Sequence, residues 1–260
     1  VLLAAGELRP HTDVKKSCFI GELSLAGELR SVPGMLSMAL GAEKCGIKKL
    51  FVPADCASEA SFAEGVEVYP VSHIKELFAH FDNIETIKPL KAPNITPSFK
   101  FTHDFSDVKG QENAKRALEV AAAGGHNILM IGPPGAGKSM LAKRLPSILP
   151  SMRRDEMLET TAIYSVCGMT SRRDPVISAR PFRAPHHTVS SVAMAGGGAN
   201  PKPGEISLAH NGVLFLDELP EFSRSSMETL RQPLEDGVVT VSRVNGTVAF
   251  PCKFMLVAAM

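Results

Sequence analysis

The sequence of 260 residues lacks several patterns that mark specialised classes of protein. It has no run of ~18 or more consecutive apolar residues, so we expect no membrane-spanning helix and no membrane partner. No charged and apolar leader with a small-residue cleavage site opens it. The five cysteines contain no C-x-x-C pair, which argues against a disulfide framework and against structural zinc. We therefore expect a cytoplasmic protein with reduced thiols.

An excess of charge is also absent, because 28 Lys and Arg residues face 27 Asp and Glu residues, for a formal charge of +1. Without a global positive field, any contact with nucleic acid would need a local patch or an assembled pore. The 44% of hydrophobic residues is typical of globular proteins with a real core. Because the chain starts at Val1 and stops within the apolar run Phe254–Ala259, we expect it to be a fragment.

The pattern along the chain predicts two α/β domains. Residues 1 to 81 form the first, with strands and helices at Cys18–Leu25, Met35–Cys45, Lys49–Pro53, Val66–Pro70 and Ser72–Phe81. Residues 82 to 104 are expected to be a linker, because Pro89, Pro93 and Pro97 favour extended chain. Residues 105 to 260 form the second domain.

In the second domain, strands are predicted at Asn127–Ile131, Gly212–Asp217 and Phe254–Met260, and helices at Gln111–Ala123, Ser139–Leu149 and Arg224–Leu234. The alternating segment Val238–Phe250 predicts a hairpin around Asn245-Gly246. Between Pro150 and Gly212 the pattern loosens.

The most specific motif runs from Gly132 to Ser139 and fits G-x-x-x-x-G-K-[ST] at every required position. Glycines let successive N–H groups point inward around an anion, and the following helix adds the positive end of its dipole. Lys138 can reach the β- and γ-phosphates of ATP, and Ser139 can ligate Mg²⁺. The nucleotide-contacting set is Gly132, Pro133, Pro134, Gly135, Ala136, Gly137, Lys138, Ser139 and Met140. The alternative is a glycine-rich turn that matches by chance.

A second motif, Val213–Glu218, is an apolar strand that ends in two carboxylates. Asp217 is expected to serve the metal, and Glu218 to polarise an attacking water. The alternative for Glu218 is a simple helix cap, in which case its replacement would not change turnover.

These motifs, with Phe105-Ser-Asp-Val-Lys-Gly-Gln111, resemble the AAA+ ATPases. The segments Arg180–Thr188, Pro203–His210 and Leu219–Phe222 resemble more narrowly the magnesium-chelatase-related branch and its ComM- and YifB-like competence proteins. The resemblance implies an incomplete αβα AAA+ core without its lid, in a homo-hexameric ring. It also places Val108, Gly110 and Gln111 near the adenine, and a hairpin insertion in about Thr188–Ile206.

The N-terminal domain resembles part of the Lon protease domain, a ribosomal-protein-like α/β fold, at Gly21–Leu25 and Gly46–Pro53. Met38 stands where the resemblance places the catalytic lysine of Lon. A thioether cannot deprotonate a serine nucleophile, so we expect this domain to be non-proteolytic.

Arginines in the second domain are candidates for contact with DNA phosphates, namely Arg172, Arg173, Arg183 and Arg243. The alternative is a solvated or intersubunit face. The pair His186-His187 is not expected to bind metal, because neighbours in an extended segment point to opposite sides and no third ligand is suitably spaced.

Three functions follow from these patterns and from the resemblance. The first is a hexameric, ATP-dependent motor on DNA, a branch-migration helicase in natural transformation. The second is the ATPase subunit of a chelatase that inserts metal into a tetrapyrrole. The third is a nucleotide-binding module that does not turn over ATP in this fragment.

Overall fold

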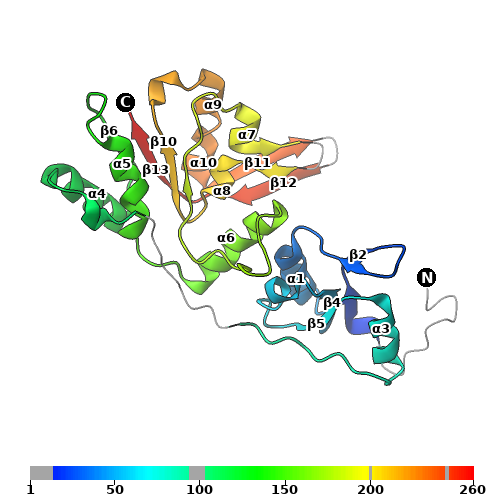
Figure 1. The fold of residues 1–260 in the computed structure, drawn as a ribbon. Coiled ribbons are helices and arrows are strands. Elements are labelled where there is room, and N and C mark those ends of the chain that lie inside the picture. Colours follow the sequence, from blue (N-terminus) through cyan, green and yellow to red (C-terminus); the bar gives the residue numbers. More distant parts are fainter. Residues whose placement is uncertain (1–13, 94–102, 199–200, 244–245) are drawn as a thin grey trace. The chain divides into compact units, whose positions relative to one another are not determined.

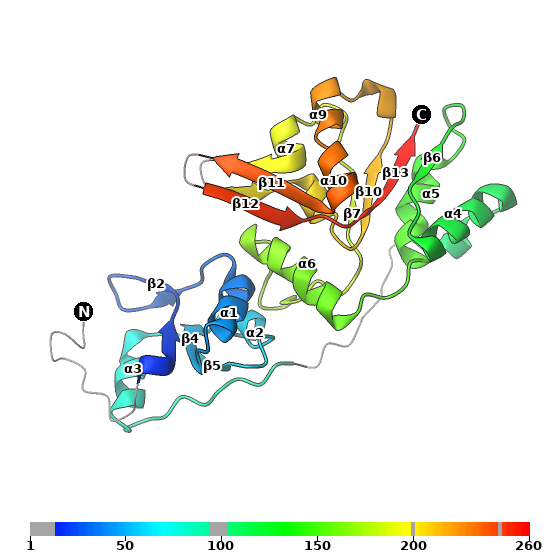
Figure 2. The ribbon, with the colours of Figure 1, turned by 180° about the vertical axis from the view of Figure 1, so that it is seen from behind.

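The computed structural model describes residues 14–93, 103–198, 201–243 and 246–260, which divide into two compact units (Figures 1 and 2). The first unit contains Val1–Ile95 together with Tyr164–Ile177, and the second contains Thr96–Ile163 and Ser178–Met260. A segment from the loosely patterned part of the sequence therefore belongs with the N-terminal unit. None of the described helices is long and apolar enough to cross a membrane.

The first unit is built on a parallel sheet of order β1-β4-β5, formed by Ser17–Phe19, Lys49–Pro53 and Glu67–Val71. Helices α1 (Met35–Lys44) and α2 (Ala57–Ala60) pack on the face that carries Leu50 and Val52. Helix α3 (Ile74–Phe81) packs on the face that carries Phe51. Because both faces are covered, the central strand is apolar at successive positions rather than alternating.

Two predicted elements of this unit differ from the structure by more than one residue. The predicted strand Cys18–Leu25 is interrupted at Gly21 (φ +156°), after which β2 (Glu22–Leu23) pairs with β3 (Leu29–Arg30) as a hairpin. Helix α3 begins after His73 rather than at Ser72, because the His73 ring accepts a hydrogen bond from the Lys75 amide at 3.1 Å and caps the helix. A 3₁₀ turn, η1 (Val14–Lys16), precedes β1.

The segment Tyr164–Ile177 is held in the first unit by a buried carboxylate, Glu59. Its Oε1 accepts hydrogen bonds from the Leu36 amide, at 2.8 Å, and from the Ser165 hydroxyl, while its Oε2 accepts one from the Thr170 hydroxyl at 2.7 Å. Leu36 lies in the first turn of α1, where backbone N–H groups have no partner within the helix. One side chain therefore caps a helix and anchors a segment more than a hundred residues away in the sequence.

The second unit is built on a parallel sheet of order β6-β13-β10-β7, formed by Ile128–Met130, Met255–Ala259, Val213–Leu216 and Phe182–Arg183. Helices α4 (Glu112–Gly124) and α5 (Lys138–Arg144) cover one face, where Phe215 joins a core with Leu118 and Leu141. Leu214 and Leu216 face the other side and pack with Met194 and Ile206. This arrangement confirms an α/β fold with a parallel sheet.

Helix α6 (Arg154–Val166) lies in the part of the sequence where the pattern loosens. Several of its buried positions carry polar residues, namely Thr160, Thr161 and Ser165, so the sequence shows no apolar stripe at helical spacing. The three hydroxyls find partners within the protein. The Thr161 hydroxyl, for example, donates to the Met157 carbonyl oxygen at 2.6 Å.

Prolines set the bounds of two other predicted helices. Helix α5 ends at Arg144 and continues as the 3₁₀ turn η3 (Leu145–Ser147), which contains Pro146. The predicted helix Arg224–Leu234 is divided into α9 (Arg224–Glu228) and α10 (Arg231–Asp236). Pro233 lacks an amide hydrogen, and its ring would clash with the carbonyl of the fourth residue before it, which accounts for this break.

Two hairpins and two 3₁₀ turns complete the second unit. Strands β8 (Gly196–Gly197) and β9 (Lys202–Pro203) form a short hairpin between α7 (Ser191–Ala195) and α8 (Glu205–Leu208), within the predicted insertion. The predicted larger hairpin consists of β11 (Val238–Arg243) and β12 (Gly246–Pro251). Its Asn245 lies outside the described residues. The 3₁₀ turns are η2 (Phe105–Asp107) and η4 (Leu219–Glu221).

Candidate nucleotide site

The glycine-rich loop follows β6 and leads directly into α5 at the carboxyl end of the sheet, where ligands bind in open α/β folds. Gly135 and Gly137 have φ values of +80° and +85°, in the left-handed region that residues with a Cβ rarely adopt. Gly137 is also the residue that precedes the first turn of α5. The glycines of the motif are therefore required by the backbone path of the loop itself.

The Lys138 ammonium group folds back over this loop. Its Nζ donates hydrogen bonds to the carbonyl oxygens of Gly132 at 2.6 Å and Pro133 at 3.1 Å. A positive charge consequently lies within the curve of the backbone, where phosphate oxygens would compete with these carbonyls as acceptors. Contact of Lys138 with phosphate stays a prediction of the motif.

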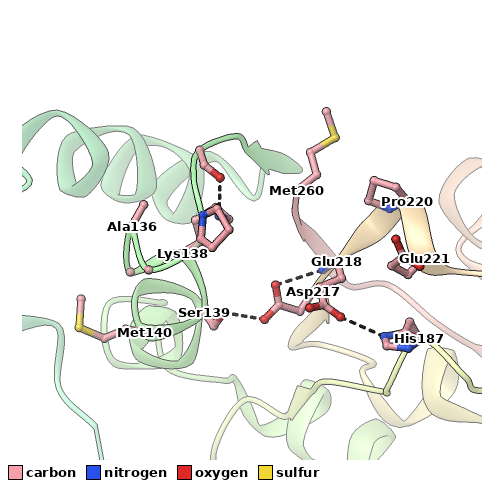
Figure 3. A pocket seen from close by; sticks show the side chains of 14 residues that line it. Ala136, Lys138, Ser139, Met140, His187, Asp217, Glu218, Pro220, Glu221 and Met260 are labelled. Atoms are coloured by element: carbon pink, nitrogen blue, oxygen red, sulfur yellow. Dashed lines mark hydrogen bonds and ion pairs between the residues drawn. The ribbon is translucent and has the colours of Figure 1, made fainter.

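The loop and the β10 carboxylate meet directly. The Ser139 hydroxyl donates a hydrogen bond to Asp217 Oδ2 at 2.5 Å, and both residues are partly buried (Figure 3). A hydroxyl and a carboxylate are hard oxygen donors of the kind that Mg²⁺ prefers, so this pair fits that ion. Bound together with ATP, Mg²⁺ would neutralise charge on the phosphate oxygens.

Glu218 follows Asp217 with an unusual backbone conformation, φ +54° and ψ +48°. A non-glycine residue in this region costs about 1–3 kcal/mol, and such residues cluster at functional sites. The Glu218 amide donates to Asp217 Oδ1 at 3.1 Å. The Glu218 side chain is 66% exposed and lies 3.1 Å from His187 Nδ1 (Figure 3). The two neighbouring carboxylates thus have different partners.

These groups surround one cavity of about 730 Å³. It is lined by the loop residues Gly132, Pro134, Gly135, Ala136, Gly137, Lys138, Ser139 and Met140, and by His187, Asp217, Glu218, Pro220, Glu221 and Met260. Figure 3 shows Lys138 and Ser139 facing Asp217 and Glu218 across it. The cavity therefore combines a cation, backbone donors and carboxylates, as a triphosphate with its metal requires.

The three residues expected near the adenine do not line this cavity. Val108 is 3% exposed and belongs to the core that contains Phe105. Gly110 and Gln111 form a left-handed turn, with φ values of +67° and +56°. The Gln111 amide group donates to the Ala136 carbonyl oxygen at 3.3 Å, so this turn touches the loop. Their contact with a base stays a prediction.

The candidate DNA-facing arginines lie in different surroundings. The Arg183 guanidinium makes two hydrogen bonds of 2.7 Å with the Glu205 carboxylate, so its charge is paired within the second unit. Arg172 and Arg173 belong to the first unit and are exposed, and Arg172 lies 3.6 Å from Asp55. Arg243 is the last residue of β11. Arg172 and Arg173 thus belong to a different unit from Arg183 and Arg243, and contact of any of them with DNA stays a prediction.

The expectation that His186 and His187 point to opposite sides is wrong. Their ring centroids are 4.0 Å apart, because the chain turns here and the Val189 amide bonds back to the His186 carbonyl oxygen. No group of three His, Cys, Asp or Glu residues suited to a metal occurs in the described part of the chain. Sequence reasoning missed His187 as a residue of the cavity, since nothing in its spacing from Glu218 indicates contact.

Comparison with known families gives matches at both ends of the chain. Residues 104–260 match the family model described as magnesium chelatase, subunit ChlI. Residues 1–56 match a second model, described as subunit ChlI of Mg-chelatase.

Curated relatives match the whole chain. It is 46% identical over 259 residues to the protein YifB of Escherichia coli, and 43% identical over 263 residues to the competence protein ComM of Haemophilus influenzae. Both alignments cover 100% of this chain and 51% of the relative, so the chain spans about half their length. Lon protease 2 of Bacillus subtilis is 31% identical over 138 residues, which are 51% of this chain and 25% of that protein.

Proposed function

The chain belongs to the magnesium chelatase family of AAA+-related ATPases, close to YifB and ComM, and on this premise we propose that it hydrolyses ATP with Mg²⁺ to drive a ring-shaped motor on DNA. The observation that carries the ATPase part is the 2.5 Å contact between Ser139 and Asp217. It joins the phosphate loop to the strand that ends in two carboxylates, across 78 residues of sequence.

The residues that line the cavity have different roles in the proposed reaction. Lys138 and the amides of the loop bind and orient the phosphates, while Ser139 and Asp217 hold the metal ion. Glu218 orients the attacking water and accepts its proton, so it acts as the catalytic base. The backbone strain at Glu218 supports this role, because a mere surface residue would gain nothing from a left-handed conformation.

The DNA part of the proposal is supported by sequence similarity to a named relative. ComM of Haemophilus influenzae is named a competence protein, and its 43% identity with this chain is measured over 263 residues that cover 100% of the chain. We propose a homo-hexamer that promotes branch migration of incoming strands, with the Lon-like N-terminal domain non-proteolytic. The exposed Arg172 and Arg173, and Arg243 at the end of β11, remain the candidates for contact with phosphate.

The first test is ATP turnover by the full-length protein and by its Glu218→Gln variant. Loss of a general base reduces turnover by about 10²–10⁴-fold, while ATP binding should remain. Glu119→Gln is a matched control, because Glu119 lies on α4, 49% exposed, in an ion pair with Arg116. Full turnover by Glu218→Gln would remove Glu218 from catalysis.

The second test separates the DNA motor from a chelatase subunit, the other function that the matched family favours. Turnover is measured with single-stranded, forked and three-stranded DNA, and separately with a chelatase partner and porphyrin. Stimulation by DNA together with unwinding supports the motor. An active ATPase that responds only to the chelatase partner would transfer the proposal to metal insertion. ATP binding without turnover in the full chain would leave a binding module.

A further inference from the structure

A histidine outside the motifs contacts the carboxylate to which we assign the chemistry. His187 Nδ1 lies 3.1 Å from Glu218 Oε2, and the His187 side chain is 29% exposed against 66% for Glu218 (Figure 3). Both side chains line the cavity that contains Lys138 and Asp217. The contact therefore lies beside the reacting groups and not at a remote part of the surface.

The segment that carries His187 is fixed at several points. The His186 ring packs against the His187 ring, and His186 Nδ1 bonds to the Thr188 hydroxyl at 2.9 Å. The Val189 carbonyl oxygen accepts a hydrogen bond of 2.9 Å from the fully buried Ser226 hydroxyl. An imidazole on such a segment is already ordered, so its contact with the Glu218 carboxylate costs little additional conformational entropy.

Glu218, in contrast, is fixed mainly through its backbone. The left-handed turn and the bond from its amide to Asp217 set the direction in which the side chain leaves the chain. Its three side-chain torsions remain to be restricted, and freezing a glutamate side chain costs up to about 2 kcal/mol. A fixed donor at one carboxylate oxygen supplies that restriction.

We propose that His187 is a positioning residue for Glu218, an inference that rests on the proposed ATPase function. A carboxylate only accepts hydrogen bonds, so in this role Nδ1 of His187 is the donor toward Glu218 Oε2. His187 keeps its Nδ1 proton throughout and holds Oε2, while Oε1 remains to accept the proton of the attacking water. The histidine thus sets the orientation of the base without itself exchanging a proton with water.

The test compares His187→Ala with His187→Asn in the full-length protein. Partners that orient a reacting group typically contribute 10–100-fold to activity, so we expect His187→Ala to lower kcat by about that factor with KM for ATP little changed. Asparagine places an amide donor near the position of Nδ1 and should restore most of the turnover. The control is His126→Ala, an exposed histidine just before β6, at the end of that strand away from the loop.

A double substitution distinguishes positioning from an independent effect. If His187 acts through Glu218, His187→Ala should add almost no loss to Glu218→Gln, because the group that it orients is gone. The inference, but not the ATPase function, would be overturned if the kcat losses of the two single variants multiplied in the double variant. It would also be overturned if His187→Ala had the same kcat as an active wild type. A wild type that binds ATP but has no turnover would instead remove the proposed ATPase function, and this inference with it. If the His187→Ala variant does not fold, the His187→Asn variant tests the positioning role instead. Its kcat should then remain within severalfold of the wild-type value.

Discussion

The buried Glu59 carboxylate provides the sharpest test of how the first unit is held together. Glu59→Ala removes the acceptor of three hydrogen bonds, from the Leu36 amide and from the Ser165 and Thr170 hydroxyls. Hydrogen bonds to a charged group contribute about 1.5–3 kcal/mol each, but the two hydroxyls can turn toward other acceptors. The low end of that range predicts a loss of about 3–5 kcal/mol.

Hydrogen exchange of the backbone amides measures this loss at the place where it occurs. We expect exchange in the first turn of α1 and in Tyr164–Ile177 to accelerate by at least about 100-fold, since 1.4 kcal/mol corresponds to a factor of ten. Glu59→Gln keeps the size and one acceptor oxygen, and should lose only about 1–2 kcal/mol. Glu85→Ala is the control, because Glu85 is exposed.

If Glu59→Ala left exchange in both segments at the wild-type rate, the carboxylate would not be their anchor, and the assignment of Tyr164–Ile177 to the first unit would lose its main physical reason. Faster exchange everywhere in the unit would indicate a global effect, in which Glu59 supports the core rather than these two segments.

Two further predictions concern titratable groups. Burial lowers the pKa of His210, whose Nδ1 accepts a hydrogen bond from the Lys253 amide. The neutral form of His210 therefore stabilises the fold at pH values above the unfolded pKa of about 6.5. This stabilisation is lost as the pH falls through the lower pKa of the folded state. Unfolding at pH 5 and pH 7.5 should therefore differ less in His210→Gln than in wild type, and an equal difference would contradict this. Burial raises the pKa of the Cys252 thiol to about 12 and that of the Cys56 thiol to about 11. A thiol reagent at pH 8 should therefore label the exposed Cys45 before these two residues. Labelling of Cys252 or Cys56 before Cys45, detected by mass spectrometry, would contradict this.

Local patterns in the sequence predicted the elements whose signal is local. The strand Lys49–Pro53 has the predicted bounds, and the phosphate loop lies between a strand and a helix as its motif requires. Asp217 was assigned to the metal from its place at the end of an apolar strand. The structure places Asp217 in contact with Ser139, because carboxyl ends of parallel strands share one edge of a sheet, while its role as a metal ligand stays a prediction.

Features that depend on contacts between distant residues left no comparable signal. Helix α6 was missed because Thr160 and Ser165 occupy buried positions, and polar residues there are tolerated only through partners elsewhere in the fold. Ser165 is satisfied by Glu59, which no helical periodicity could reveal. In the same way, the contact of His187 with Glu218 follows from the turn after β7 and not from any spacing.

The left-handed residue that follows β10 explains how two adjacent carboxylates acquire separate partners. In a regular strand, neighbouring side chains point to opposite faces of the sheet, so one of them would leave the cavity. At φ +54°, Glu218 turns the chain sharply, and both side chains reach the cavity with different partners, Asp217 with Ser139 and Glu218 with His187. Glycine would adopt this turn without strain but would carry no carboxylate. The strain of about 1–3 kcal/mol therefore falls on the residue that we propose as the catalytic base.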